Sequence, residues 1–343
     1  EKEEEDKEEE EEEGGTAILT DLFNKTGLIE DKNQVTFNRY VSAEDIVEDM
    51  QMGYDLASSL DAYDQTKTNV NEGLKSETFW GNPLITIQTI SEYAKLGFKT
   101  IRIPVTWHNH IIDKNYTIDP KWMNRVKTVV DMAIQNKLYV ILNMQYDEAN
   151  YSDDPIGYGE GYYLLRKDFR ESCRFIYNVW RQIVIAFNSG YDEHLIFQSF
   201  NQPKLKGLDE EWWCKENSKT CTEAVNVLDE YNDIIFKVIR NSGGNNRNRF
   251  VMFTPLGANI DNLFKFPFKF PRETGIFTFI TRTMLSLHFY IPYNFALNED
   301  KAYKKFGDEE EDEILDDLEY LYRTFIRRGY QVILSEIGSF DKD

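Results

Sequence analysis

Short apolar runs alternate with amphipathic stretches along the chain. Several runs are almost continuously apolar, such as "LYVILNM" at 138–144, which is typical of a parallel strand covered on both faces. In the stretch 121–137, Trp122, Val126 and Val129 recur at helical spacing. This pattern predicts seven strands, at 53–58, 100–105, 138–144, 195–200, 250–256, 284–289 and 330–337.

Helices are predicted between these strands, at 83–97, 121–137, 168–187 and 223–244. Such an order requires right-handed crossovers and a parallel sheet. An open doubly wound sheet would usually carry a glycine-rich phosphate loop after an early strand, whereas "NSGGNN" at 241–246 follows a helix. The alternation therefore predicts the α/β class and a (β/α)8 TIM barrel, which needs about 250 residues. Because only seven strands can be counted, we expect the eighth strand and the last helix to be lacking.

The charge of the chain is strongly acidic and unevenly distributed. The formal net charge is -21, and residues 1–13 alone hold ten Glu, one Asp and two Lys. A block of like charges without apolar residues cannot offset the entropy of ordering. We therefore predict a disordered acidic tail over 1–15, an N-terminal extension over 16–44 and a barrel over 45–343. The acidic balance excludes nucleic acid and anionic membrane surfaces as partners, because both need a basic surface.

The cysteines and sequons bear on location and on metals. Cys214 and Cys221 lie in the polar loop "WWCKENSKTC", where their spacing suits a loop-closing disulfide better than a metal site. The four histidines show no paired spacing on one helix, so we predict no metal, and we expect no cofactor. Asn-x-Ser/Thr triplets at Asn24, Asn115 and Asn150 permit glycosylation. Together these features favour a secreted, extracellular protein.

Polar side chains stand at the C-terminal ends of five predicted strands. In (β/α)8 barrels these ends converge on one face, which carries the chemistry. A single polar strand end can be explained by its exposure to solvent, but polar groups on five strands together are not explained in this way. We therefore predict a ligand cleft at this face. The residues are Arg102, Asn143, Gln145, Asn201, Gln202, His288, Tyr290 and Glu336.

Several ordered motifs resemble a known family. They include "FWGNP", "LGFKTIRIPVTWHNHI", "HLIFQSFNQP", "LSLHFYIPYNF" and "QVILSEIGSF". Over roughly residues 45 to 340 the chain resembles glycoside hydrolase family 5, the cellulase family, and most closely its endoglucanase and xyloglucanase branch. The resemblance implies a retaining mechanism on a β-1,4-linked glucan or a related plant cell-wall polysaccharide. In that mechanism one carboxyl group attacks the anomeric carbon and a second protonates the leaving oxygen.

The resemblance also implies roles for individual residues. Glu336 matches the nucleophile of the family, and Arg102 matches the arginine that keeps such a nucleophile ionised. Tyr290 matches a tyrosine that hydrogen-bonds the nucleophile. His288 and Asn201 match residues that orient sugar hydroxyls.

The acid/base position departs from the family pattern. The family carries it in an Asn-Glu-Pro motif, where this chain has Gln202. A primary amide can hydrogen-bond a sugar but cannot donate a proton to a departing oxygen. Gln145, followed by Tyr146, also replaces a histidine of the family, and "YDLAS" at 54–58 replaces its Trp-Asn-Leu-Gly-Asn pattern. These added departures favour natural divergence over a single designed substitution.

Three functions remain open from the sequence. The first is an active endo-β-1,4-glucanase acting in polysaccharide catabolism, in which Asp147 or Glu148 replaces the missing acid. The second, which Gln202 favours, is an impaired or inactive β-glucan-binding barrel; Gln145, Tyr146, Trp107 and Trp212 are its expected substrate contacts, because aromatic rings stack on sugars. The third is a structural or docking module of a larger extracellular cellulolytic assembly, with the acidic segments 1–15 and 307–319 as contact surfaces.

Overall fold

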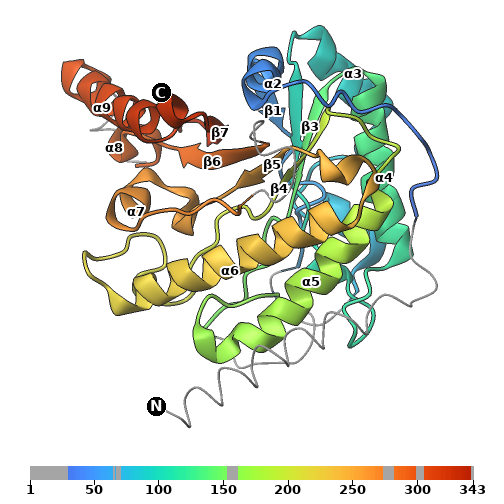
Figure 1. The fold of residues 1–343 in the computed structure, drawn as a ribbon, viewed down its shortest axis with the longest axis horizontal. Coiled ribbons are helices and arrows are strands. Elements are labelled where there is room, and N and C mark those ends of the chain that lie inside the picture. Colours follow the sequence, from blue (N-terminus) through green and yellow to red (C-terminus); the bar gives the residue numbers. More distant parts are fainter. Residues whose placement is uncertain are drawn as a thin grey trace.

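Seven parallel strands form one curved sheet in the computed structural model, which describes residues 30–64, 66, 71–152, 161–272, 282–298 and 305–340. The strands pair in the order in which they occur in the chain, each with the next (Figure 1). Six of them lie within the stretches that the apolar runs predicted, and β6 begins one residue earlier, at Thr283. They are β1 (Gly53–Asp55), β2 (Thr100–Ile103), β3 (Tyr139–Asn143), β4 (Leu195–Gln198), β5 (Val251–Phe253), β6 (Thr283–Phe289) and β7 (Gln331–Ile337).

Helices connect successive strands and cover the outside of the sheet (Figure 1). The four predicted helices are confirmed as α3 (Ile87–Lys95), α4 (Pro120–Gln135), α5 (Phe169–Ala186) and α6 (Lys219–Asn241). The acidic run that begins at Gly307 forms a helix, because carboxylates in a first turn suit its positive end. The other α-helices of the described residues are α2 (Ala43–Met50), α7 (Ile260–Lys265), α8 (Tyr293–Ala296) and α9 (Asp308–Thr324).

Successive side chains of a strand point to opposite faces of the sheet, so they pack in two separate apolar cores. Outward side chains such as Val140, Leu142 and Phe197 pack against the helices in the largest apolar cluster. Inward side chains near the strand starts, such as Ile141 and Ile196, pack with α2 in a second cluster. The interior is therefore apolar at the end that α2 covers, which leaves the C-terminal strand ends for polar groups.

The extension that the sequence placed before the barrel contributes to this second core. Phe37 is buried and its ring lies 6.3 Å from that of Phe250, at the start of β5. Ile46 and Met50 of α2 are also buried in the same cluster. The predicted boundary at residue 45 falls inside α2, while the predicted acidic tail lies outside the described residues.

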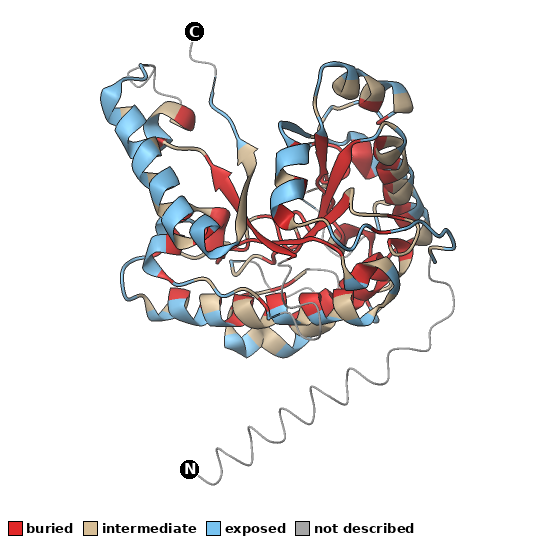
Figure 2. Ribbon diagram, turned by 45° about the horizontal axis from the view of Figure 1, so that its top comes forward, coloured by how far each residue is buried: buried red, intermediate tan, exposed pale blue. Residues whose placement is uncertain are grey.

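The two end strands of the sheet are the least buried. Every residue of β7 is half-buried or exposed, and β1 has two exposed residues, whereas β2 to β6 are buried throughout (Figure 2). Within the described ranges, no eighth strand joins β7 to β1. In the described part of the chain the barrel is therefore nearly closed, with an opening between β7 and β1.

The predicted disulfide joins Cys214 to Cys221 and closes the loop before α6. Closing a loop of this size restricts the unfolded chain, so we expect a Cys214→Ser/Cys221→Ser variant to lose about 2 to 3 kcal/mol of unfolding free energy in urea titrations. Cys173→Ser removes the free thiol and leaves the disulfide intact, which makes it the matched control. An equal loss in both variants would contradict a stabilising role for the disulfide.

None of the helices in the described ranges has the length and apolar composition that crossing a membrane requires.

Candidate active site

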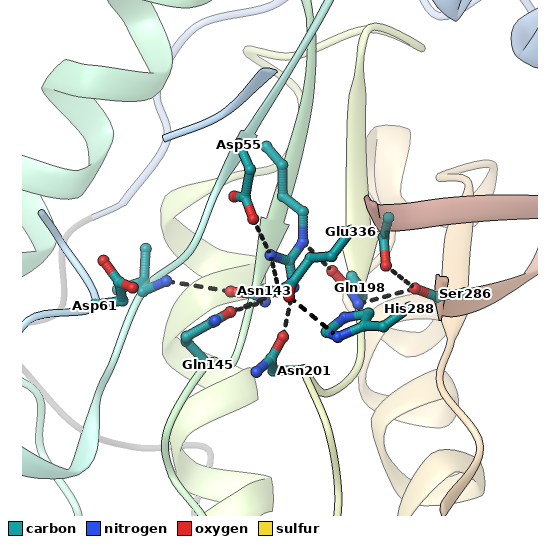
Figure 3. Close-up of polar contacts among 12 residues, drawn as sticks. Asp55, Asp61, Asn143, Gln145, Gln198, Asn201, Ser286, His288 and Glu336 are labelled. Carbon is teal, nitrogen blue, oxygen red and sulfur yellow. Dashed lines mark hydrogen bonds and ion pairs between the residues drawn. The ribbon is translucent and has the colours of Figure 1, made fainter. Parts of the chain in front are cut away.

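Arg102 lies at the centre of a polar cluster above the apolar interior. Its side chain projects inward from β2 and is almost fully buried. It makes five hydrogen bonds, which match the five N–H donors of a guanidinium. The acceptors are Gln198, Asp55, Glu336, Gln145 and Asn201, at 2.9, 2.9, 2.8, 3.3 and 2.7 Å (Figure 3). The ends of five strands therefore meet at one guanidinium.

Glu336, near the end of β7, is held by charged and polar neighbours. Oε1 accepts from Nη1 of Arg102, and Oε2 accepts from the Tyr290 hydroxyl at 3.0 Å. His288 Nδ1 lies 3.1 Å from Oε2, but it is too poorly aligned for a hydrogen bond. Tyr290 and His288 reach Glu336 because β6 pairs with β7 across a register shift at Leu287 and His288.

These neighbours favour the ionised form of Glu336. Burial opposes ionisation, but His288, Arg102 and Tyr290 together outweigh it and lower the pKa of Glu336. Burial lowers the pKa of His288 to about 4, against the attraction of Glu336, so this imidazole is neutral at neutral pH. Within the described residues, neither of its ring nitrogens has an aligned hydrogen-bond partner, and both nitrogens are buried.

Asn201 and Gln202 stand where β4 ends. Asn201 uses its side-chain oxygen on Arg102, which leaves its amide nitrogen for a ligand. Gln202 is half-buried, and its side chain makes no hydrogen bond to any residue that the structure describes. The acid/base position is therefore occupied by an amide next to the residue that ties β4 to the Arg102 cluster.

Gln145 and Tyr146 begin the loop after β3 on the same side of the cluster. The Gln145 side-chain oxygen accepts from both Arg102 and Asn143, so its orientation is fixed. The ring of Tyr146 lies 5.7 Å from that of Trp80 and 6.1 Å from that of Tyr63. We call Tyr63, Trp80 and Tyr146 the aromatic cluster; its three rings are half-buried and stand beside the polar site.

The two predicted tryptophan contacts differ. Trp107 is 0% exposed, and its indole nitrogen donates to the main-chain oxygen of Asn143, so the prediction that it contacts substrate is wrong. The ring packs in the largest apolar cluster, between the strands and the helices. Trp212 is 38% exposed, but Lys204 Nζ lies 3.8 Å from its ring centre and occupies one face.

The two carboxylates proposed as substitutes for the acid form other interactions. Asp147 Oδ1 accepts from the main-chain nitrogens of Trp107 and His108, at 2.9 and 2.6 Å, and so holds the turn after β2. Glu148 Oε1 lies 3.4 Å from Lys204 Nζ. Both side chains are buried, so neither offers an exposed acid to the cleft.

Sequence reasoning missed two members of the cluster. Asp55 ends β1 in register with Arg102, and Gln198 interrupts the apolar run of β4. A polar residue at an inward position of a strand could have indicated both. Burial raises the pKa of Asp55 to about 6, although Arg102 opposes the shift.

One group of possible metal ligands occurs in the described part of the chain. Asp192, Glu193 and His194 bring ligand atoms within 4.8 Å of one another. They precede β4, so they lie at the opposite end of the strands from the Arg102 cluster. Asp192 Oδ1 is 3.0 Å from His194 Nδ1, so these two side chains already form a hydrogen bond with each other.

Comparison with known proteins defines the class of this barrel. Residues 63–343 match the family described as Cellulase (glycosyl hydrolase family 5). The chain belongs to glycosyl hydrolase family 5, as the sequence motifs indicated.

Relatives in this family are endoglucanases. The chain is 34% identical to Endoglucanase B of Ruminococcus albus over 305 residues, which are 88% of this chain and 66% of that protein. It is 32% identical to Endoglucanase A of Clostridium longisporum over 328 residues, or 94% of this chain and 58% of that one. The chain thus spans less than two thirds of the length of these curated relatives.

Solved structures of the family have the same fold. A glutamate-to-glutamine mutant of a family 5 lichenase from a Caldicellulosiruptor species, in complex with cellotetraose, has a TM-score of 0.79 at 31% identity, covering 93% of this chain and 82% of that one. A broad specificity endoglucanase from Ruminococcus champanellensis with bound cellotriose has a TM-score of 0.76 at 30% identity, covering 88% and 81%. The fold is therefore the family's (β/α)8 barrel, with seven strands in the described residues.

Proposed function

We propose that this protein is a secreted β-glucan-binding barrel in which hydrolysis is absent or very slow. The observation that carries the proposal is Gln202, an amide at the acid/base position beside an otherwise complete Arg102 cluster. An amide has no proton to donate to a leaving oxygen and cannot later activate water as a base. The cluster retains donors and acceptors for sugar hydroxyls, while the chemistry lacks one of its two carboxyl groups.

The surroundings of the cluster support binding of a glucan. The aromatic cluster supplies rings for stacking against pyranose faces, and Asn201 supplies the amide nitrogen of its side chain. Related barrels hold cellotetraose and cellotriose, one of them as a glutamate-to-glutamine mutant. A barrel of this family that lacks one glutamate can thus bind a β-glucan oligosaccharide. The disulfide and the sequon at Asn115 support an extracellular setting.

Binding and hydrolysis separate the candidate functions. We expect cellotetraose and barley β-glucan to bind in calorimetric titrations, while reducing-sugar release stays at background. Trp80→Ala should weaken binding about twofold to tenfold, because a stacked ring contributes roughly 0.5–1.5 kcal/mol. Tyr322→Ala, which removes an exposed ring on α9, is the control and should leave the affinity unchanged.

Two outcomes would contradict the proposal. Reducing-sugar release that disappears in Glu336→Gln would identify an active endoglucanase. If neither binding nor release is detected, the role of a docking module in an extracellular assembly would be favoured instead.

A further inference from the structure

A single nitrogen of Arg102 bonds two carboxylates. Nη1 donates to Asp55 Oδ2 at 2.9 Å and to Glu336 Oε1 at 2.8 Å (Figure 3). The two oxygens can therefore be no farther apart than these two bond lengths together. Both side chains are mostly buried, with exposed fractions of 26% and 15%, so solvent screens their repulsion only in part.

The charges around this pair do not balance. Arg102 on β2 is the cation that contacts Asp55, while Glu336 on β7 and Asp61 in the loop after β1 add negative charge. His288 on β6 is neutral at neutral pH, and burial raises the pKa of Tyr290, which keeps its phenol protonated. One guanidinium thus faces more than one carboxylate, and a proton can enter this site at mildly acidic pH.

Within the pair of Asp55 and Glu336, the contacts decide which carboxyl group takes the proton. Both oxygens of Glu336 accept hydrogen bonds, from Arg102 and from Tyr290. Asp55 uses only Oδ2, and its Oδ1 is buried with no hydrogen-bond partner among the described residues. A carboxylate with a bare buried oxygen is the costlier of the two to keep ionised. The pKa values agree in direction, since that of Asp55 is raised to about 6 and that of Glu336 is lowered.

We propose that Asp55 is a positioning residue of the cleft, which shares Nη1 of Arg102 with Glu336, carries the proton of the pair and sets the charge around the nucleophile position. This inference rests on the proposed function, in which Glu336 faces the anomeric carbon. When Asp55 is ionised, the site has one more negative charge. That charge favours a sugar ring on which positive charge develops during attack.

A mechanism-based label tests this without a proton donor at residue 202. A 2-deoxy-2-fluoro-β-cellobioside with a dinitrophenolate leaving group forms an ester between its anomeric carbon and Glu336. The bond from that carbon to the phenolate oxygen breaks, and the phenolate departs as an anion. Intact-mass measurements at several pH values then report the labelling rate of Glu336.

We expect the rate in the wild-type protein to rise about fivefold to tenfold from about pH 5 to about pH 7, as Asp55 ionises. Asp55→Asn and Asp55→Ala should both give a flat profile over this range. Asp317→Asn on α9 is the matched control, because burial also raises the pKa of Asp317 to about 6 but Arg102 does not contact it. The control should keep the wild-type profile, and an Asp55→Asn variant that keeps the rise would overturn the inference.

Thermal unfolding gives an independent decision if no variant is labelled, a result that would count against a reactive nucleophile at Glu336 rather than against the pair, whereas loss of cellotetraose binding would count against the proposed function. The pKa of Asp55 in the folded protein is raised above its usual 3.8, so the folded state holds this proton more tightly than the unfolded state does. The stability that the bound proton contributes is fully present below about pH 3.8 and is lost as the pH rises through about 6. Asp55→Asn should therefore raise Tm relative to the wild type more at about pH 7.5 than at about pH 5. Equal shifts at both pH values would refute the shared proton.

Discussion

Gln202→Glu should raise hydrolysis of barley β-glucan by about 10² to 10⁴, the contribution that a positioned general acid usually makes. The reason is that the groups around the nucleophile position are in place. Glu336 bonds Arg102 and Tyr290, and Asn201 bonds the same guanidinium, so a carboxyl group at residue 202 would follow a fixed neighbour. Reducing-sugar release at saturating substrate measures the gain.

Two further variants make the result specific. Gln88→Glu makes the same amide-to-acid change on the exposed face of α3 and should have no effect. Combining Gln202→Glu with Glu336→Gln should return the rate to background. If Gln202→Glu releases no more reducing sugar than the wild type while cellotetraose still binds, the missing acid is not the sole defect. Gln145 would then be the first candidate, because it stands where the family has a histidine.

The elements of the barrel could be predicted because their signals are local. A parallel strand covered on both faces is buried throughout and therefore largely apolar, and β3, β4 and β5 consist mainly of such apolar runs. The rule that barrel chemistry sits at strand ends then selected Arg102, Asn201 and Glu336 without any coordinates, and these residues do meet.

The failures concern side chains whose positions depend on distant partners. Trp107 follows a strand and is aromatic, which suggested a loop position, but Asp147 binds the turn after β2 and the ring is buried in the largest apolar cluster. Asp55 stands at a strand end as well, yet its importance comes from a guanidinium 47 residues away that also binds Glu336. No local pattern encodes the sharing of one nitrogen by two carboxylates.

Because Arg102 is buried between two carboxylates, we expect its replacement to lower the stability of the protein strongly. We expect Arg102→Met to lower the unfolding free energy by about 3 to 5 kcal/mol in urea titrations, because removing one partner of a buried ion pair leaves the other charge uncompensated. Here two carboxylates, Asp55 and Glu336, would lose their shared donor. Methionine keeps much of the apolar volume of the arginine stem, so the loss reports the five hydrogen bonds rather than a cavity.

A surface ion pair provides the matched control. Arg166→Met breaks the pair with Glu230, whose side chains are about half exposed, and should cost no more than about 1 kcal/mol. The two variants should also differ in their response to pH. Without Arg102 the buried carboxyl groups have higher pKa values, so they are protonated in acid, and the loss in Arg102→Met should shrink from about pH 7.5 to about pH 5. A loss equal to that of Arg166→Met, or one independent of pH, would mean that the guanidinium does not hold the strand ends together.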